Sequence, residues 1–329
     1  MKIENFSLWC DFIERDFLEK EFPTMIKDGM VNGATSNPAI FKEAFLSSPA
    51  YKEDIKANSG KSAKEVYENL ATKDIKKAAK ILRGLYDKGD DGFISIEIDP
   101  LLCDDVSGSL EEAKMLLAKI DEPNVMIKVP ATNAGFEVMQ KLFESGVNVN
   151  ATLIFSPDQA KKCLEAFERG LSRFKGKLKP KGVISVFVSR FDRALNETLA
   201  KKGLPINLLG IYNATYIYHL IQEKGIQEVR TLFASTGVKG DDLKKEHYIN
   251  ELLYQNSINT APINAIEAFE KSNSLIQKEP ISKKEIETFL SNLENADIDI
   301  NSIYEGLLAE GLQAFKKAFK EILNELEKG

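Results

Sequence analysis

The sequence predicts an α/β protein folded as a single (βα)₈ barrel of the TIM type, with extra helices in one connection and a helical tail. Three observations support this prediction. Short β-branched runs alternate with longer amphipathic stretches along most of the 329 residues. Eight such runs are present, and four of them carry polar side chains on one face only. Because barrels of about 250 residues or more commonly form one domain, we expect residues 1–329 to be one domain.

The predicted strands are rich in Val, Ile, Phe and Thr and are bounded by turn-forming or charged residues. They cover 8–12, 31–35, 93–98, 125–130, 147–155, 183–188, 231–236 and 257–262. The order of strand and helix signals predicts parallel strands that are joined by helical crossovers.

Helix start signals fall between these runs. We expect one helix to open with a capping box formed by Ser109 and Glu112. A second helix has Ser156 as N-cap, Pro157 in its first turn and Gln159 to complete the box.

Two longer helical segments stand outside the regular repeat. Residues 39–90 are rich in Lys, Ala and Glu with helical periodicity and predict extra helices in this connection. Residues 263–329 predict a helical C-terminal extension. Apolar residues recur there at three- and four-residue intervals, so we expect the tail to pack on the barrel or on a neighbouring subunit. They are Leu312, Phe315, Phe319 and Leu323.

Composition narrows the classes of function. The formal charge of −6 argues against nucleic-acid partners, and no apolar run approaches the roughly 20 residues that span a bilayer. The odd number of cysteines, with Cys10, Cys103 and Cys163 far apart, predicts no disulfide framework and favours the cytoplasm. His219 and His247 lack clustered partners, so we predict no metal site.

Side chains alternate between the two faces of a strand, and here the alternation separates aliphatic from polar residues. In 147–155 we assign Val149, Ala151 and Leu153 to the outer face, and Asn150, Thr152 and Ile154 to the inner face. Active sites of (βα)₈ barrels lie at the carboxyl ends of the strands. We therefore expect five inward residues to converge there: Glu97, Lys128, Asn150, Thr152 and Ser185.

Lys128 lies inside a run that otherwise predicts a buried strand. Burying an uncompensated charge costs several kcal/mol, so this lysine either pairs with an acid or loses its proton. A neutral amine in a desolvated site can attack a carbonyl carbon and begin Schiff-base catalysis, with Glu97 supplying proton transfers. The alternative is a buried Lys128–Glu97 ion pair, and residue spacing alone leaves both open.

Six segments, in this order, resemble the transaldolase family, and more narrowly its longer bacterial form. The resemblance covers about residues 7–262 and continues less distinctly into the tail. The segments are ATSNPAIF (34–41), IEID (96–99), MIKVPAT (126–132), VNVNATLIFS (147–156), SVFVSRFD (185–192) and ASTGVKG (234–240).

The resemblance implies an enzyme of the pentose phosphate pathway that needs no metal or organic cofactor. It would move a dihydroxyacetone unit from a ketose phosphate, sedoheptulose 7-phosphate or fructose 6-phosphate, to an aldose phosphate. The acceptor would be glyceraldehyde 3-phosphate or erythrose 4-phosphate. Sugar phosphates are then the only partners expected, with no nucleic acid or membrane, and the chain would be a monomer or a homodimer.

The resemblance also implies roles for individual residues. Lys128 matches the Schiff-base lysine, Glu97 and Thr152 match the pair that holds the catalytic water, and Asp11 matches the acid that deprotonates the substrate hydroxyl. The remaining matches concern substrate binding. Thr35, Asn37, Asn150 and Ser185 match contacts to the three-carbon unit, and Arg190 and Ser235 match phosphate contacts.

Some of these residues have structural alternatives. Asp11 could be an acid at a helix start that interacts with the helix dipole. Arg190 could pair with Asp192 or Glu197, and Asn37 could shape the turn before Pro38.

The segment 234–240 departs from the commonest family pattern, which has an arginine two places after the serine. Here Thr236, Gly237 and Val238 precede Lys239, and Lys239 could replace that phosphate contact.

Three other functions remain open. These are an aldolase that releases free dihydroxyacetone, a pyridoxal-phosphate enzyme using Lys128, and a non-catalytic barrel that binds sugar phosphates.

Overall fold

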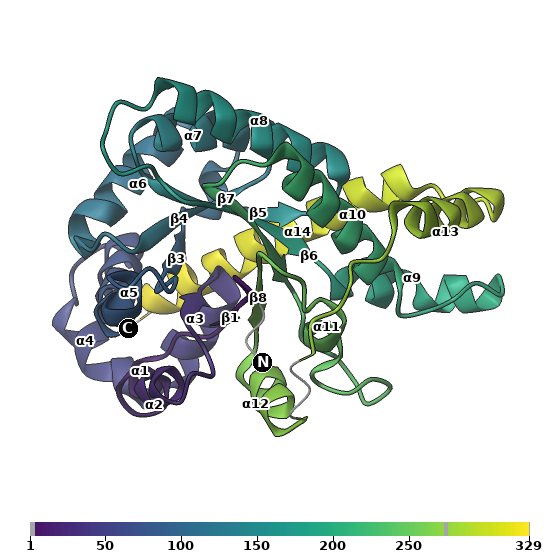
Figure 1. Ribbon diagram of the computed structural model, residues 1–329. Helices are drawn as coiled ribbons and strands as arrows, with labels where there is room; N and C mark the ends of the chain where they lie inside the picture. Colours follow the sequence, from purple (N-terminus) through teal and green to yellow (C-terminus); the bar gives the residue numbers. More distant parts are fainter. Residues whose placement is uncertain (1–3, 273–275, 329) are drawn as a thin grey trace.

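Eight parallel strands close into one barrel in the order β1 to β8 (Figure 1). The computed structural model describes residues 4–272 and 276–328. The strands are β1 (Ser7–Cys10), β2 (Gly33–Thr35), β3 (Ile94–Glu97), β4 (Val125–Pro130), β5 (Asn148–Ile154), β6 (Gly182–Phe187), β7 (Val229–Ala234) and β8 (Ser257–Ala261). The predicted (βα)₈ class is confirmed, and no strand end differs from its prediction by more than two residues.

Helices surround the barrel. Those of the regular repeat are α1 (Arg15–Lys20), α2 (Phe22–Lys27), α6 (Val106–Ile120), α7 (Asn133–Glu144), α8 (Pro157–Arg173), α9 (Ser189–Lys201), α10 (Leu209–Lys224), α11 (His247–Glu251) and α12 (Ile263–Ser272). The 39–90 connection is helical as predicted and holds α3 (Pro38–Ser47), α4 (Lys52–Ala57) and α5 (Ala63–Tyr86). Two short 3₁₀ turns, Pro49–Tyr51 and Pro100–Leu102, complete the elements before β4.

One of the two predicted helix starts is confirmed and one is wrong. Ser156 forms the capping box with Gln159 at the start of α8. The box predicted for Ser109 and Glu112 does not form, because α6 begins a turn earlier with Asp105 as its N-cap. Aspartate is an equally good cap, and the earlier start leaves Ser109 inside the helix, where its hydroxyl donates to the Leu102 carbonyl.

Two apolar layers hold the barrel together. The outer layer lies between strands and helices and includes Ile96, Ile127 and Ile184. The inner layer fills the barrel, where Trp9 is fully buried. A Cβ on Gly33 would lie 2.5 Å from the Trp9 Nε1 atom, so only glycine lets the indole pack against β2.

The alternation predicted for the end of β5 is wrong. Leu153 has a positive φ of 58°, and the register between β5 and β6 shifts between Ala151 and Ile154. This bulge inserts one residue, so Leu153 joins the inner layer and Ile154 joins the outer layer. The predicted alternation of Asn150 inward and Ala151 outward precedes the bulge and is unaffected.

The C-terminal extension contributes α13 (Lys283–Asn295) and α14 (Ile300–Leu326), while residues 273–275 and 329 of the predicted 263–329 segment lie outside the described residues. Figure 1 shows α14, in yellow, running across the barrel toward α3 and α5, which it contacts. Phe315 and Phe319 are buried on its inner face, as their spacing predicts. The Phe319 ring packs edge-on against Tyr67 of α5, with ring centroids 4.9 Å apart.

Within the described residues, no helix has the length and apolarity required to cross a membrane. Cys10, Cys103 and Cys163 are free thiols, and all three are buried.

A buried charge network joins α1 to α5. Asp74 is 1% exposed and accepts from the Tyr51 hydroxyl at 2.7 Å and from the Arg15 Nη2 at 3.0 Å. Asp74→Ala removes the acceptor of the buried Tyr51 hydroxyl and one of the two acidic partners of Arg15, which still pairs with Asp54. We therefore expect the free energy of unfolding to fall by about 2 kcal/mol or more in denaturant titration. Asp16→Ala removes the exposed pair with Lys20 and should cost under about 1 kcal/mol. Equal losses in the two variants would contradict the network's role.

Candidate active site

A cavity of about 160 Å³ opens at the carboxyl ends of the strands. Residues from β2, β4, β6, β7, β8, α3, α9 and α14, together with residues that directly follow β1, β2 and β7, line it. They are Asp11, Thr35, Asn37, Ala39, Lys128, Ser185, Phe187, Arg190, Ala234, Ser235, Thr260 and Phe315. The structure therefore brings seven of the sequence-predicted site residues to one cavity. Of the five inward residues expected to converge, Lys128 and Ser185 line this cavity, whereas Glu97, Asn150 and Thr152 do not.

Lys128 projects from β4 into this cavity and is 5% exposed. Its Nζ donates to the Ser36 carbonyl oxygen at 3.1 Å. The nearest Glu97 oxygen lies 3.6 Å from Nζ, which is a salt-bridge distance but too long for a good hydrogen bond. One backbone acceptor thus holds the amine, and its other hydrogen-bonding directions face the cavity.

Glu97 on β3 is in register with Lys128, and Thr152 on β5 is in register with Pro130, two residues beyond Lys128 on β4. Both Glu97 carboxyl oxygens and the Thr152 hydroxyl are buried without a hydrogen-bond partner. Burial raises the pKa of Glu97 to about 7, against the opposing attraction of Lys128. A carboxyl group that titrates near neutral pH is suited to passing protons in both directions. The unpaired Thr152 hydroxyl is available to help orient a water beside it.

Asp11 follows β1 and is held by a hydroxyl pair. Thr35 Oγ1 donates to Asp11 Oδ1 at 2.6 Å and lies 2.7 Å from Thr260 Oγ1. Burial raises the pKa of Asp11, while Lys128 and the Thr35 hydrogen bond oppose that rise. The N-cap of α1 is Glu14, so the helix-start role considered for Asp11 belongs to Glu14.

A chain of neutral donors and acceptors runs across the inner face of three strands. Ser185 Oγ donates to Asn150 Oδ1 at 2.6 Å, and Asn150 Nδ2 donates to Ser95 Oγ at 3.0 Å. Asn150 is paired in register with Lys128 on the neighbouring strand. These contacts fix the amide orientation of Asn150. Ser185 lines the cavity and so connects this hydrogen-bonded chain to it.

Asn37 has two roles in the geometry. Its side chain caps α3 by accepting from the backbone N–H groups of Ala39 and Ile40, at 2.9 and 3.1 Å. It also lines the cavity. The turn-shaping alternative for Asn37 is therefore confirmed, and it is compatible with a substrate contact because the amide nitrogen is not used by the cap.

A basic group stands at one edge of the cavity. Arg190 lies in the first turn of α9, and its guanidinium carbon is 5.1 Å from the centre of the Phe187 ring. Among the described residues Arg190 forms no salt bridge, and the suggested acids have other partners: Asp192 accepts from Tyr248, and Glu197 pairs with Lys201. Burial and the like charge of Arg193 lower the pKa of Arg190. This half-buried guanidinium, which forms no salt bridge among the described residues, fits an anion.

Ser235 lies beside Arg190 at the end of β7. Its Oγ is 3.2 Å from Ser189 Oγ, and its backbone has a positive φ of 55°. A non-glycine residue in this conformation is uncommon and recurs at functional sites. Ser235, Ser189 and the N-terminus of α9 place several donors around one edge of the cavity, which is a usual setting for phosphate.

Lys239 does not join this group. It is exposed and is not among the cavity-lining residues. Its phosphate contact stays a prediction.

Six residues at the site were missed from the sequence. They are Ser36, which acts through its carbonyl oxygen, and the lining residues Ala39, Phe187, Ala234, Thr260 and Phe315. Thr260 near the end of the eighth strand could have been found from the polar-face pattern, whereas Phe315 comes from the tail and carried no such signal.

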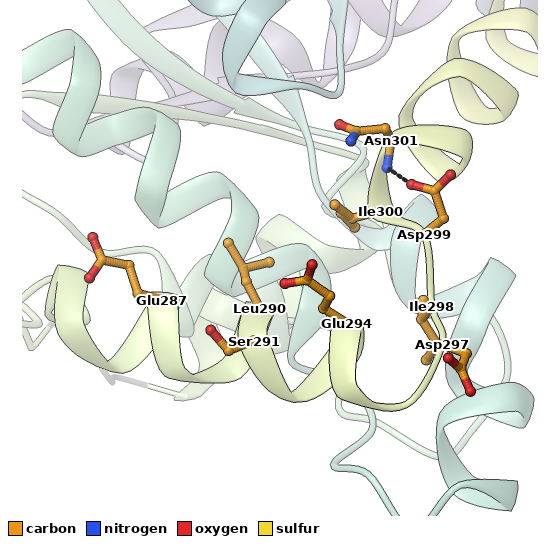
Figure 2. Close-up of a pocket in the computed structure, with 9 residues that line it drawn as sticks. All are labelled: Glu287, Leu290, Ser291, Glu294, Asp297, Ile298, Asp299, Ile300 and Asn301. Carbon is orange, nitrogen blue, oxygen red and sulfur yellow. Dashed lines mark hydrogen bonds between the residues drawn. The ribbon is translucent and has the colours of Figure 1, made fainter.

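A second groove, at the junction of α13 and α14, has the opposite electrostatic character. Figure 2 shows four carboxylates around it, from Glu287, Glu294, Asp297 and Asp299. Asp299 also caps α14 by accepting from the Asn301 N–H. These negative charges repel phosphate, so this groove does not suit phosphorylated ligands.

Within the described residues no group of His, Cys, Asp and Glu side chains is arranged to hold a metal ion.

Fold and site together define a (βα)₈ barrel enzyme with a buried lysine beside a carboxyl group that titrates near neutral pH. The chain belongs to the Transaldolase/Fructose-6-phosphate aldolase family, which it matches over residues 8–326.

Proteins named transaldolase are similar along nearly the whole chain. One from Campylobacter jejuni subsp. jejuni serotype O:23/36 (strain 81-176) is 50% identical over 333 residues, covering 98% of this chain and 100% of that protein. One from Helicobacter pylori (strain P12) is 44% identical over 322 residues, covering 98% and 99%.

The raised pKa of Glu97 predicts a specific pH dependence of stability. As pH rises from about 4.3 to 7, the unfolded chain gives up the Glu97 proton while the folded protein keeps it, so the wild type loses stability relative to Glu97→Gln. We expect a relative gain of about 3 kcal/mol for the variant between pH 4 and pH 8, measured by denaturant unfolding. Glu43→Gln, at an exposed position of α3, is the control. A pH-independent difference between wild type and Glu97→Gln would contradict the prediction.

Proposed function

We propose that this protein is a transaldolase that moves a dihydroxyacetone unit from a ketose phosphate to an aldose phosphate through a Schiff base on Lys128. The observation that carries the proposal is the arrangement around Lys128. Lys128 is 5% exposed, and its amine lies 3.6 Å from Glu97 and faces a cavity with a basic edge. Near-full-length similarity to proteins named transaldolase supports the same reaction.

The first step forms the imine. The Lys128 amine gives up a proton as it adds to the ketose carbonyl carbon, and the resulting carbinolamine loses water. The Glu97 carboxyl group, with a pKa near 7, supplies and recovers the protons of this step through a water held against Thr152. Both groups have buried oxygens with free hydrogen-bonding capacity, which supports their use by a water and a substrate.

The second step breaks the carbon–carbon bond. The Asp11 carboxylate removes the proton from the substrate hydroxyl, which collapses to the aldehyde as the bonding electrons flow into the protonated imine. Thr35 and Thr260 orient Asp11 for this role. The aldose phosphate leaves, and the three-carbon unit remains on Lys128 as an enamine.

Transfer then requires the enamine to survive until an acceptor aldehyde binds. Ser185, the Asn150 amide behind it and the free amide nitrogen of Asn37 are neutral hydrogen-bonding groups, and the Ser185 oxygen can accept while its proton is donated to Asn150. They can hold the hydroxyl groups of the unit without protonating its carbon. Attack of the enamine carbon on the acceptor reverses the earlier steps and releases the new ketose phosphate.

The phosphate is proposed to bind at the edge formed by Arg190, Ser235 and the N-terminus of α9. The guanidinium offers paired donors, and the positive end of the α9 dipole favours an anion, although the Ser189 and Phe191 N–H groups already donate to backbone carbonyl oxygens. Burial of Arg190 beside Phe187 strengthens its attraction for an anion, because the local dielectric constant is lower than that of water.

We also propose that the chain acts as one domain in the cytoplasm, as a monomer or a homodimer, with 263–329 as an extension of the barrel. Contacts of α14 with α3 and α5 support the single domain. Three buried free thiols are suited to a reducing compartment.

A related reaction is the second candidate. The family description names fructose-6-phosphate aldolase beside transaldolase, and an aldolase would use the same lysine to release free dihydroxyacetone. The ratio of released dihydroxyacetone to transfer product separates the two reactions.

The Schiff base is tested by trapping. Incubation with fructose 6-phosphate and borohydride should leave a reduced three-carbon adduct on Lys128, located by intact-protein and peptide mass spectrometry. Lys128→Met should give no adduct. A folded wild-type protein that binds sugar phosphate but gives no adduct would favour the non-catalytic barrel.

The phosphate site is tested by kinetics. Arg190→Gln removes a charge-assisted contact, so we expect KM for phosphorylated donors to rise about ten- to hundredfold with a smaller change in kcat. Lys239→Ala should also raise KM more than it lowers kcat if this exposed lysine reaches the phosphate, and an unchanged KM would remove it from the site. Non-phosphorylated fructose is the control donor, whose KM should not change in either variant.

A further inference from the structure

We propose that Phe315, on the C-terminal helix α14, is a specificity-determining residue that keeps water away from the Lys128 enamine and so favours transfer over release of the three-carbon unit. The inference rests on the proposed transaldolase function. The C-terminal helix would then exclude water from the enamine, which the eight strands do not do.

Phe315 lies directly at the reacting amine. The centre of its ring is 5.7 Å from Lys128 Nζ, and the ring lines the same cavity as Asp11 and Thr35. Phe315 is 5% exposed, as is Lys128. The polar groups of the cavity come from the barrel and its loops, and the helix opposite them contributes an apolar ring. Water that approaches the amine from this side must displace that ring.

The position of Phe315 is fixed by contacts on either side of it along α14. One turn further on, Phe319 packs on Tyr67 of α5, and Glu321 pairs with Lys42 of α3 at 2.6 Å. One turn before it, Gly311 lies against the β5 bulge, where an added Cβ would be 2.9 Å from Leu153 Cδ2. The helix is therefore held to the barrel mouth on both sides of the ring.

The enamine has two competing fates. If its carbon attacks an acceptor aldehyde, a new carbon–carbon bond forms and transfer is completed. If the carbon instead takes a proton from water or an acid, the iminium that results adds water across its C=N bond, and free dihydroxyacetone leaves as the Lys128 amine is restored. The second route needs mobile water beside Lys128, and an apolar ring at that position limits it.

The ring limits the volume of the cavity. At about 160 Å³ the cavity has room for only a few waters of about 30 Å³ each, and a bound substrate leaves less space for them. Replacing Phe315 by alanine enlarges a cavity that is lined by a carboxyl group and hydroxyls. Enlarged polar cavities fill with water, whereas apolar ones stay dry. The variant therefore places water where the ring stood.

The test measures the ratio of free dihydroxyacetone to transfer product, with fructose 6-phosphate as donor and erythrose 4-phosphate as acceptor. We expect Phe315→Ala to raise this ratio about tenfold, and Phe315→Leu to raise it less because leucine keeps an apolar side chain in place. Phe289→Ala is the matched control. It removes a ring of similar burial from α13, where Phe289 packs on Tyr212 at 4.7 Å, away from the cavity. Its ratio should equal that of the wild type.

An unchanged ratio in folded Phe315→Ala would overturn the proposal, and so would an equal rise in Phe289→Ala, which would indicate general loosening of the tail. If Phe315→Ala does not fold, a ratio in Phe315→Leu equal to that of the wild type overturns it. Failure of the underlying function looks different, because the wild type would then give neither transfer product nor a borohydride-reduced adduct on Lys128.

Discussion

Burial of the Lys128 amine beside Glu97 is the constraint on which the rest of the site depends. The Lys128 and Glu97 side chains are 7% and 3% exposed, and the Lys128 Nζ lies 3.6 Å from a Glu97 carboxyl oxygen. Removing both from water is costly, and the ion pair at that distance recovers only part of the cost. Burial therefore leaves the Glu97 carboxyl group with a pKa near 7 rather than its usual value. The fold thus gives Glu97 the pKa that proton transfer at neutral pH requires.

The surrounding structure holds this costly arrangement in place. Outer-layer residues such as Ile96 and Ile127 pack the same two strands under the helices and secure the register that sets Glu97 opposite Lys128. Thr35 and Asn150 are each fixed by hydrogen bonds to neighbouring polar groups, so the cavity wall is organised before a substrate binds. Catalysis by such a site draws on preorganised groups that need little rearrangement during the reaction.

The bulge in β5 and the C-terminal helix link the barrel to the control of water. The positive φ of Leu153 turns its side chain into the inner layer, against Gly311 of α14. The same helix carries Phe315 to within 5.7 Å of Lys128 Nζ. An extension of the chain beyond the eight strands thus becomes one wall of the cavity. In the role proposed for Phe315, retention of the enamine depends on the C-terminal helix as well as on the strands.

The amino-acid sequence by itself determined the barrel, its eight strands, the extra helices of 39–90 and the inward-facing set that includes Lys128, Glu97 and Asn150. These follow from periodicity, which local side-chain pattern encodes directly. Family resemblance added Asp11, Arg190 and Ser235, which spacing alone did not identify. Tertiary structure decided the rest, because it depends on contacts between distant segments. The β5 bulge, the Ser36 carbonyl that holds the lysine, and the placement of Phe315 over the cavity arise from packing that no local pattern records.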